Sequence, residues 1–154
     1  MAAMLVLTVG SLCSTGSARE GDLLEELLTA PLACSFQAVS VGQFRDLDYA
    51  PGVPSGTTVV MIAASPEDLH QGRAALIERE RAAIAQIVVT SKLALFVGAA
   101  QEGDIVALTL FVSARSRAGL PASLTRHSMV GNVPVLAQST GYCRPGINGS
   151  RRPD

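Results

Sequence analysis

Short hydroxyl side chains and glycines gather between residues 10 and 18, ahead of a segment with helical character. The hydroxyl groups belong to Ser11, Ser14, Thr15 and Ser17. Gly10 and Gly16 permit close backbone approach, and the helix N-terminus that follows offers unpaired N–H groups and a partial positive charge. Arg19 adds a possible charge-assisted hydrogen bond. The pattern predicts a loop that binds a monophosphate, because the Gly-x4-Gly-Lys-Ser/Thr spacing of a triphosphate-binding P-loop is absent.

An alternation of strands and helices is expected to position this loop. Apolar runs predict buried strands over residues 4–9, 34–41, 57–64, 83–90 and 105–113. Helices are expected around residues 23–28 and from Ser65 to about residue 82. Ser65-Pro-Glu-Asp68 combines a serine cap, a proline at the first helical position and acidic residues in the first turn. This order predicts an α/β fold with a parallel sheet, in which the loops at 10–18 and 90–92 line one crevice.

The remaining segments are less regular. Glycines, prolines and polar residues predict loops over 42–56 and 114–132, and 133–137 is a candidate edge strand. Residues 93–100 fit a helix or a strand; as a strand they would form an antiparallel hairpin with 105–113 and weaken the parallel interpretation. The alternating charges of 78–81 are expected on a solvated helix face.

Composition limits the function classes. A chain of 154 residues is expected to form one domain, here over residues 1–140, followed by a polar, frayed tail over 141–154. The net charge is −1, and no basic stripe with aromatic residues indicates a nucleic-acid partner. No apolar run is long enough to span a bilayer, so a membrane partner is not expected either. The three cysteines and two histidines have no metal-ligand spacing.

Several short segments resemble a known family. The chain is similar to the NAD(P)H-dependent FMN reductases, which are flavodoxin-like proteins. The matching segments are Leu5-Val-Leu-Thr-Val-Gly-Ser-Leu12, Phe44-Arg-Asp-Leu47, Ala85-Gln-Ile-Val-Val-Thr90 and Arg126-His-Ser128. The resemblance implies a doubly wound, mostly parallel sheet with helices on both faces.

The resemblance also implies a cofactor site and an activity. FMN would be bound at the carboxyl ends of the strands, and hydride would pass to it from NAD(P)H, with no catalytic side chain required. Ser11, Ser14, Thr15, Ser17 and Arg19 would hold the phosphate. The ribityl chain and ring would lie against Thr90, Ser91, Lys92, Arg126, His127 and Ser128. Family members are commonly oligomers, so a cytoplasmic homo-oligomer that binds flavin and nicotinamide is expected.

A second interpretation of the first residues stays open. An apolar core followed by Gly16-Ser17-Ala18 also fits a cleaved secretory signal, although residues 1–10 contain no Lys or Arg. Removal of residues 1–18 would leave Cys34 and Cys143 as the only cysteines, available for one disulfide. The chain would then be a secreted or periplasmic α+β binding domain without enzymatic activity.

Overall fold

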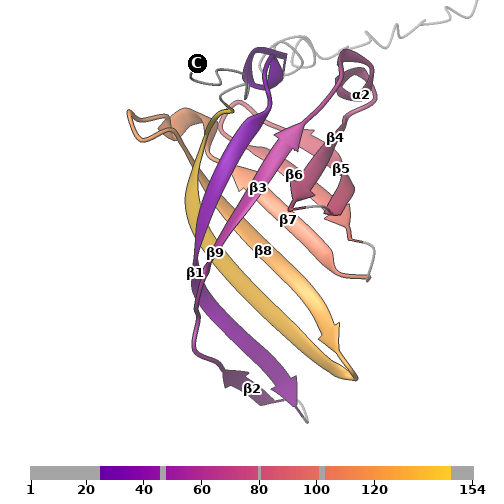
Figure 1. Ribbon diagram of the computed structural model, residues 1–154, viewed down its shortest axis with the longest axis vertical. Helices are drawn as coiled ribbons and strands as arrows, with labels where there is room; N and C mark the ends of the chain where they lie inside the picture. The colour runs from indigo at the N-terminus through magenta and orange to yellow at the C-terminus, as the bar shows by residue number, and fades with distance from the viewer. Residues whose placement is uncertain (1–24, 46–47, 80, 101–102, 147–154) are drawn as a thin grey trace, which may run out of the picture.

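Antiparallel strands make up most of the described residues in a computed structural model, which describes residues 25–45, 48–79, 81–100 and 103–146 (Figure 1). The strands are β1 (Leu32–Arg45), β2 (Asp48–Pro51), β3 (Thr57–Ala63), β4 (Arg73–Glu78), β5 (Arg81–Val89), β6 (Ala94–Ala99), β7 (Ile105–Leu110), β8 (Leu120–Val130) and β9 (Val133–Pro145). A short helix, α2 (Pro66–His70), joins β3 to β4, and a 3-10 turn, η1 (Val112–Ala114), lies between β7 and β8.

Pairing between the first and last strands closes the sheet. Strands β3 to β9 pair in chain order, and β1 pairs with both β3 and β9. The eight strands β1 and β3–β9 therefore form a closed antiparallel barrel, with β2 attached only to the far end of β1. The prediction of an α/β, flavodoxin-like fold with a doubly wound parallel sheet is wrong. The resemblance to the FMN reductases therefore indicated the wrong fold.

Apolar side chains on the outside of the barrel account for the error. In β5, Ile84 and Val88 are 61% and 56% exposed, whereas Ala83 and Ala85 are buried. A half-buried antiparallel strand usually alternates between apolar and polar residues, whereas a buried parallel strand is apolar throughout. Outward-facing Ile and Val erase the alternation, so the strand resembles one covered on both faces.

Alternate side chains fill one end of the barrel. The largest fully buried residues are Phe36, Phe96, Ile62, Leu108 and Leu110. A helical turn over residues 25–28, within the predicted first helix, adds Leu28 to the same core. We call this the closed end; the opposite end, where β4 joins β5 and β6 joins β7, is the mouth. In β9, Gly141 faces Phe36, and a side chain at 141 would collide with the Ser35 carbonyl, so the backbones of β1 and β9 approach closely.

Three strands continue past the mouth. The register of β1 against β9 shifts between Ala38 and Ser40, which marks a β-bulge, a feature that bends a strand. Beyond it β1 leaves β3 and pairs with β2, while β7 pairs with β8 only as far as His127. The ends of β1, β8 and β9 therefore project with β2 as an open sheet (Figure 1). We call this the extended sheet.

The individual segments were predicted with mixed success. Strands at 34–41, 57–64, 83–90 and 105–113 correspond to β1, β3, β5 and β7. Residues 93–100 contain a strand, β6, which forms an antiparallel hairpin with β7. The predicted loops at 42–56 and 114–132 contain β2 and all of β8, and the predicted edge strand at 133–137 is part of β9, which continues to Pro145. The predicted strand at 4–9 and residues 147–154 lie outside the described residues.

A disulfide joins Cys34 to Cys143, which face each other across the β1–β9 seam. Both side chains are buried inside the barrel. The two cysteines are 109 positions apart in the sequence. Because a cross-link over so long a separation restricts the unfolded chain strongly, we expect a large contribution to stability.

We predict that replacing both cysteines, Cys34→Ala with Cys143→Ala, lowers the free energy of unfolding by about 2–5 kcal/mol. Urea denaturation of both proteins measures the difference. Reductant added to the denatured wild type should reproduce the loss, and it should have no effect on the double variant. Equal urea midpoints for the disulfide-bonded wild type and the double variant would contradict a stabilising role for this bond.

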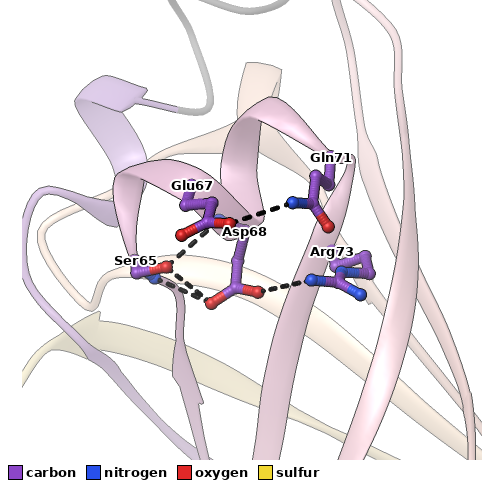
Figure 2. A network of polar contacts seen from close by, with 5 residues as sticks. All are labelled: Ser65, Glu67, Asp68, Gln71 and Arg73. Carbon is purple, nitrogen blue, oxygen red and sulfur yellow. Dashed lines mark hydrogen bonds and ion pairs between the residues drawn. The ribbon is translucent and has the colours of Figure 1, made fainter.

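The start of the predicted second helix is confirmed, but its length is wrong. Ser65 caps α2: its Oγ accepts a hydrogen bond from the Asp68 N–H at 3.1 Å and donates one to the Asp68 carboxylate at 2.6 Å (Figure 2). Arg73 pairs with the same carboxylate at 3.2 Å. The helix ends at His70, and Gly72 turns the chain with φ +65° into β4. Pairing of β4 with β3 and β5 overrides the helix propensity of residues 73–82.

We predict that Ser65→Ala lowers the free energy of unfolding by about 1 kcal/mol at neutral pH, because it removes the helix cap. The Ser65 hydroxyl, followed by the Ser65 N–H, holds the pKa of Asp68 below its ordinary value. A carboxyl with a lowered folded pKa contributes stability above its unfolded pKa, and the contribution is lost as pH falls through the folded pKa.

Urea denaturation across an acid titration tests this assignment. The difference between wild type and Asp68→Asn should shrink as the pH drops below about 4. Ser91→Ala, a substitution at an exposed turn residue, is the matched control and should change stability little. A cap variant as stable as this control would overturn the role of Ser65.

Candidate functional site

The mouth of the barrel contains a cavity of about 460 Å³. Its apolar wall consists of Val60, Leu76, Ala82, Ala83, Ala100 and Val106. Its charged residues are Glu78, Arg79, Arg81, Asp104 and Arg126. An eight-stranded barrel is just wide enough to be filled by side chains or to hold one small ligand. Large apolar side chains fill the closed end of this barrel, whereas the apolar wall of the mouth is mostly Ala and Val, so the hollow lies at the mouth.

An ion pair crosses the barrel inside this cavity. The Nη2 group of Arg126, on β8, donates to Oε2 of Glu78, on β4. Three strands separate β4 from β8 in either direction around the barrel, so the two side chains meet from opposite walls. Both follow the inward alternation of their strands, after Leu76 and Leu124, and each side chain is 31% exposed. The pair is therefore accessible to a ligand that enters from solvent.

Positive charge prevails around the cavity. Three arginines and two acidic residues line it, and the field from an excess of one sign in an apolar cleft favours ligands of the opposite sign. The guanidinium of Arg126 has several N–H donors and can bind a carboxylate in a bidentate manner. The cavity therefore suits a small molecule with an apolar body and an anionic group.

Arg79 at the rim has an unusual backbone conformation. Glu78 pairs with Arg81, so β4 and β5 join through a two-residue turn. Arg79 occupies this turn at φ +54°, and it is the one non-glycine residue with positive φ in the part of the chain that the structure describes. The left-handed region costs about 1–2 kcal/mol for an L-residue. Two-residue hairpin turns favour positive φ, and here the turn places a cation at the edge of the cavity.

A second cavity, of about 290 Å³, lies at the base of the extended sheet. Its walls come from the far part of β1, the segment 53–58, β8 and β9. Arg126 lines this cavity as well as the first one. The two hollows are therefore adjacent and share Arg126 in their walls.

The described members of the predicted flavin-binding set lie in two separate places. Ser11, Ser14, Thr15, Ser17 and Arg19 lie outside the described residues. Thr90, Ser91 and Lys92 form the β5–β6 turn, where the Thr90 hydroxyl accepts from the Leu93 N–H at 3.2 Å. This turn lies at the closed end, next to the pairing of Ala94 with Leu110.

Arg126, His127 and Ser128 lie on β8 at the mouth instead, where His127 pairs with Ile105. The structure thus separates the second and third predicted flavin segments along the barrel axis. The crevice of the predicted FMN reductase is absent from the described residues, since it requires the carboxyl ends of parallel strands to meet at one edge. Arg126 is the only member of the predicted set that lines the cavities in the described part of the chain.

Sequence reasoning missed Glu78, Arg79 and Arg81. Their alternating charges were expected on a solvated helix, but they form a hairpin turn whose charged residues line the mouth. Four charged residues, 78–81, separate the two short apolar runs Ala74-Ala-Leu-Ile77 and Ala82-Ala-Ile84. They include none of the Gly, Asn or Asp residues that mark a hairpin turn, so the local sequence contains no strong signal for the turn or for the inward direction of its side chains.

Other kinds of site find no support in the part of the chain that is described. No three His, Cys, Asp or Glu side chains there are arranged to hold a metal ion. None of the described helices has the length and apolar character needed to cross a membrane. Comparison with protein-family models and with curated proteins finds no match.

We predict that Arg79→Gly leaves the stability unchanged or raises it by up to about 1 kcal/mol, because glycine adopts the left-handed conformation without strain. Arg81→Gly, at the regular strand position across the same turn, is the control. It should lower stability by at least about 0.5–1 kcal/mol. Thermal denaturation of both variants measures the difference, and equal losses would show that the turn stores no strain.

Proposed function

We propose that this protein is a small, non-enzymatic binding domain that takes up an amphipathic anion in the mouth of its barrel. The observation that carries the proposal is the Glu78–Arg126 pair inside an open cavity with apolar walls. The volume of about 460 Å³ falls within the range of small-molecule sites.

The ion pair explains how a weakly polar barrel could select an anion. A ligand carboxylate can use the donors of Arg126 that Glu78 leaves unoccupied, and its apolar part can contact Val60, Leu76 and Val106. Glu78 keeps the arginine charge balanced when the site is empty, which reduces the cost of desolvating an unpaired cation. Glu78 thus holds the Arg126 guanidinium in position for the ligand carboxylate, and it also lowers the affinity of the site for that carboxylate.

The disulfide supports a proposal about the compartment in which the protein binds its ligand. Structural disulfides persist in oxidising compartments and are rare in the cytosol. The buried Cys34–Cys143 bond closes the barrel, so we place the protein outside the cytoplasm, secreted or periplasmic. A cleaved signal over residues 1–18 agrees with this location. Binding of FMN and NAD(P)H, assembly into a homo-oligomer and the lack of nucleic-acid and membrane partners remain predictions.

Calorimetric titration with decanoate tests the proposal. We predict that Arg126→Gln weakens binding about tenfold or more, because it removes a hydrogen-bonded charge from the ligand. Arg73→Gln is the matched control: it also breaks an arginine–carboxylate pair, but at α2 and away from the mouth. Glu78→Gln should have the opposite effect and strengthen binding, because the ligand no longer competes with a resident carboxylate.

The same titration with FMN and NADPH tests the cofactors expected from the sequence. If decanoate, FMN and NADPH all fail to bind the wild-type protein, the binding function is refuted. If Arg126→Gln and Arg73→Gln bind decanoate equally well, the anion does not lie at the mouth.

A further inference from the structure

The second cavity is lined by hydroxyl groups. Its side-chain hydroxyls belong to Ser40, Ser55, Thr58 and Ser139. They come from four segments: β1 supplies Ser40, the segment before β3 supplies Ser55, and β3 and β9 supply the other two. These hydroxyls, from three regions of the sequence, form a surface that can donate and accept hydrogen bonds without adding charge.

Most of these hydroxyls are available to a ligand. Ser40 Oγ donates to Oε1 of Gln138 at 3.3 Å, at the long end of hydrogen-bond distances. In the described residues, no side-chain hydrogen bond within the protein involves Ser55, Thr58 or Ser139. Thr58 and Ser139 are half-buried and face the cavity from opposite sides of β1. Their hydroxyls can therefore exchange water for the polar groups of a ligand.

Arg126 connects this surface to the mouth, because it lines both cavities. A carboxylate bound to its guanidinium would lie beside the hydroxyl-lined cavity on one side and the apolar wall on the other. A ligand that fits the hydroxyl-lined cavity, the guanidinium and the apolar wall needs hydroxyl groups close to a carboxylate. It also needs an apolar group attached to that polar part. A sugar acid attached to an apolar chain has this arrangement.

We propose that the two cavities are subsites of one site, and that its ligand is an amphipathic glycoside with an acidic sugar. The hydroxyls of the sugar bind the second cavity, its carboxylate binds Arg126, and its apolar group enters the mouth against Leu76 and Val106. This inference rests on the proposed function and names its ligand class.

Three matched probes separate the contributions of the sugar and of the carboxylate to binding. Octyl β-D-glucuronide carries the sugar hydroxyls, the carboxylate and the chain; octyl β-D-glucoside lacks the carboxylate; octanoate lacks the sugar. Calorimetric titration of the full chain below micellar concentrations should give the tightest binding for the glucuronide. We expect it to exceed each of the other two by about tenfold or more, the effect of one or two hydrogen bonds.

Variants that delete single hydroxyls locate the sugar. Thr58→Val and Ser139→Ala should each weaken glucuronide binding about threefold to tenfold and leave octanoate unchanged. Thr140→Val removes a hydroxyl from the exposed position next to Ser139 on β9 and should affect neither probe. Arg126→Gln should weaken both carboxylates and spare the glucoside.

The outcomes distinguish this inference from the proposed function. If octanoate binds through Arg126 but the glucuronide binds no better, or if Thr58→Val and Ser139→Ala match Thr140→Val, the sugar subsite is refuted and the anion site stands. If none of the three probes binds the wild-type protein, both proposals fail. Urea denaturation of each variant confirms that the fold is retained, so that a lost interaction is not mistaken for unfolding.

Discussion

The pairing of β1 with β9 is the interaction on which the rest of the structure depends. It joins the first and last strands of the barrel, so each of the eight strands has a neighbour on both sides within the barrel wall, where its backbone groups can be paired. The Cys34–Cys143 bond links the two strands of this seam inside the barrel. If the seam opened, two strand edges would be exposed to solvent and the apolar interior would lose its enclosure. This core contains few aromatic residues, so its stability depends more strongly on enclosure by the sheet.

The same seam produces the site. The bulge after Ala38 turns β1 away from β3, and β1 then continues along β9 into the extended sheet. This departure opens a space beside β3, which becomes the hydroxyl-lined cavity. The adjacent mouth is hollow because Ala83 and Val106 line it where Phe36 and Phe96 fill the closed end. The site is thus a product of how the barrel closes, and no single loop contains it.

Arg126 illustrates how far sequence reasoning could reach. It was proposed as a ligand-binding residue from a resemblance that turned out to be wrong, so its place between two cavities owes nothing to that argument. Glu78 was assigned to solvent because alternating charges usually are solvated. Its inward direction depends on the register of β4 in the sheet, where Glu78 follows Ala74 and Leu76 on the lumen side. No local pattern specifies that register, because strands at other positions in the chain impose it.

The sequence alone determined the local features of this protein. The apolar runs that form β1, β3, β5 and β7 and the cap at Ser65 follow from residues close in the chain, whose preferences act at short range. Only the tertiary structure decided that the strands pair antiparallel, that residues 73–78 and 81–82 form strands in place of a helix, and that Glu78 meets Arg126. Apolar content does not distinguish a parallel strand from an antiparallel one; here connections too short for a parallel crossover, such as the two-residue turn between β8 and β9, impose antiparallel pairing. The contact between Glu78 and Arg126 depends on segments far apart in the chain, which only the closed barrel brings together.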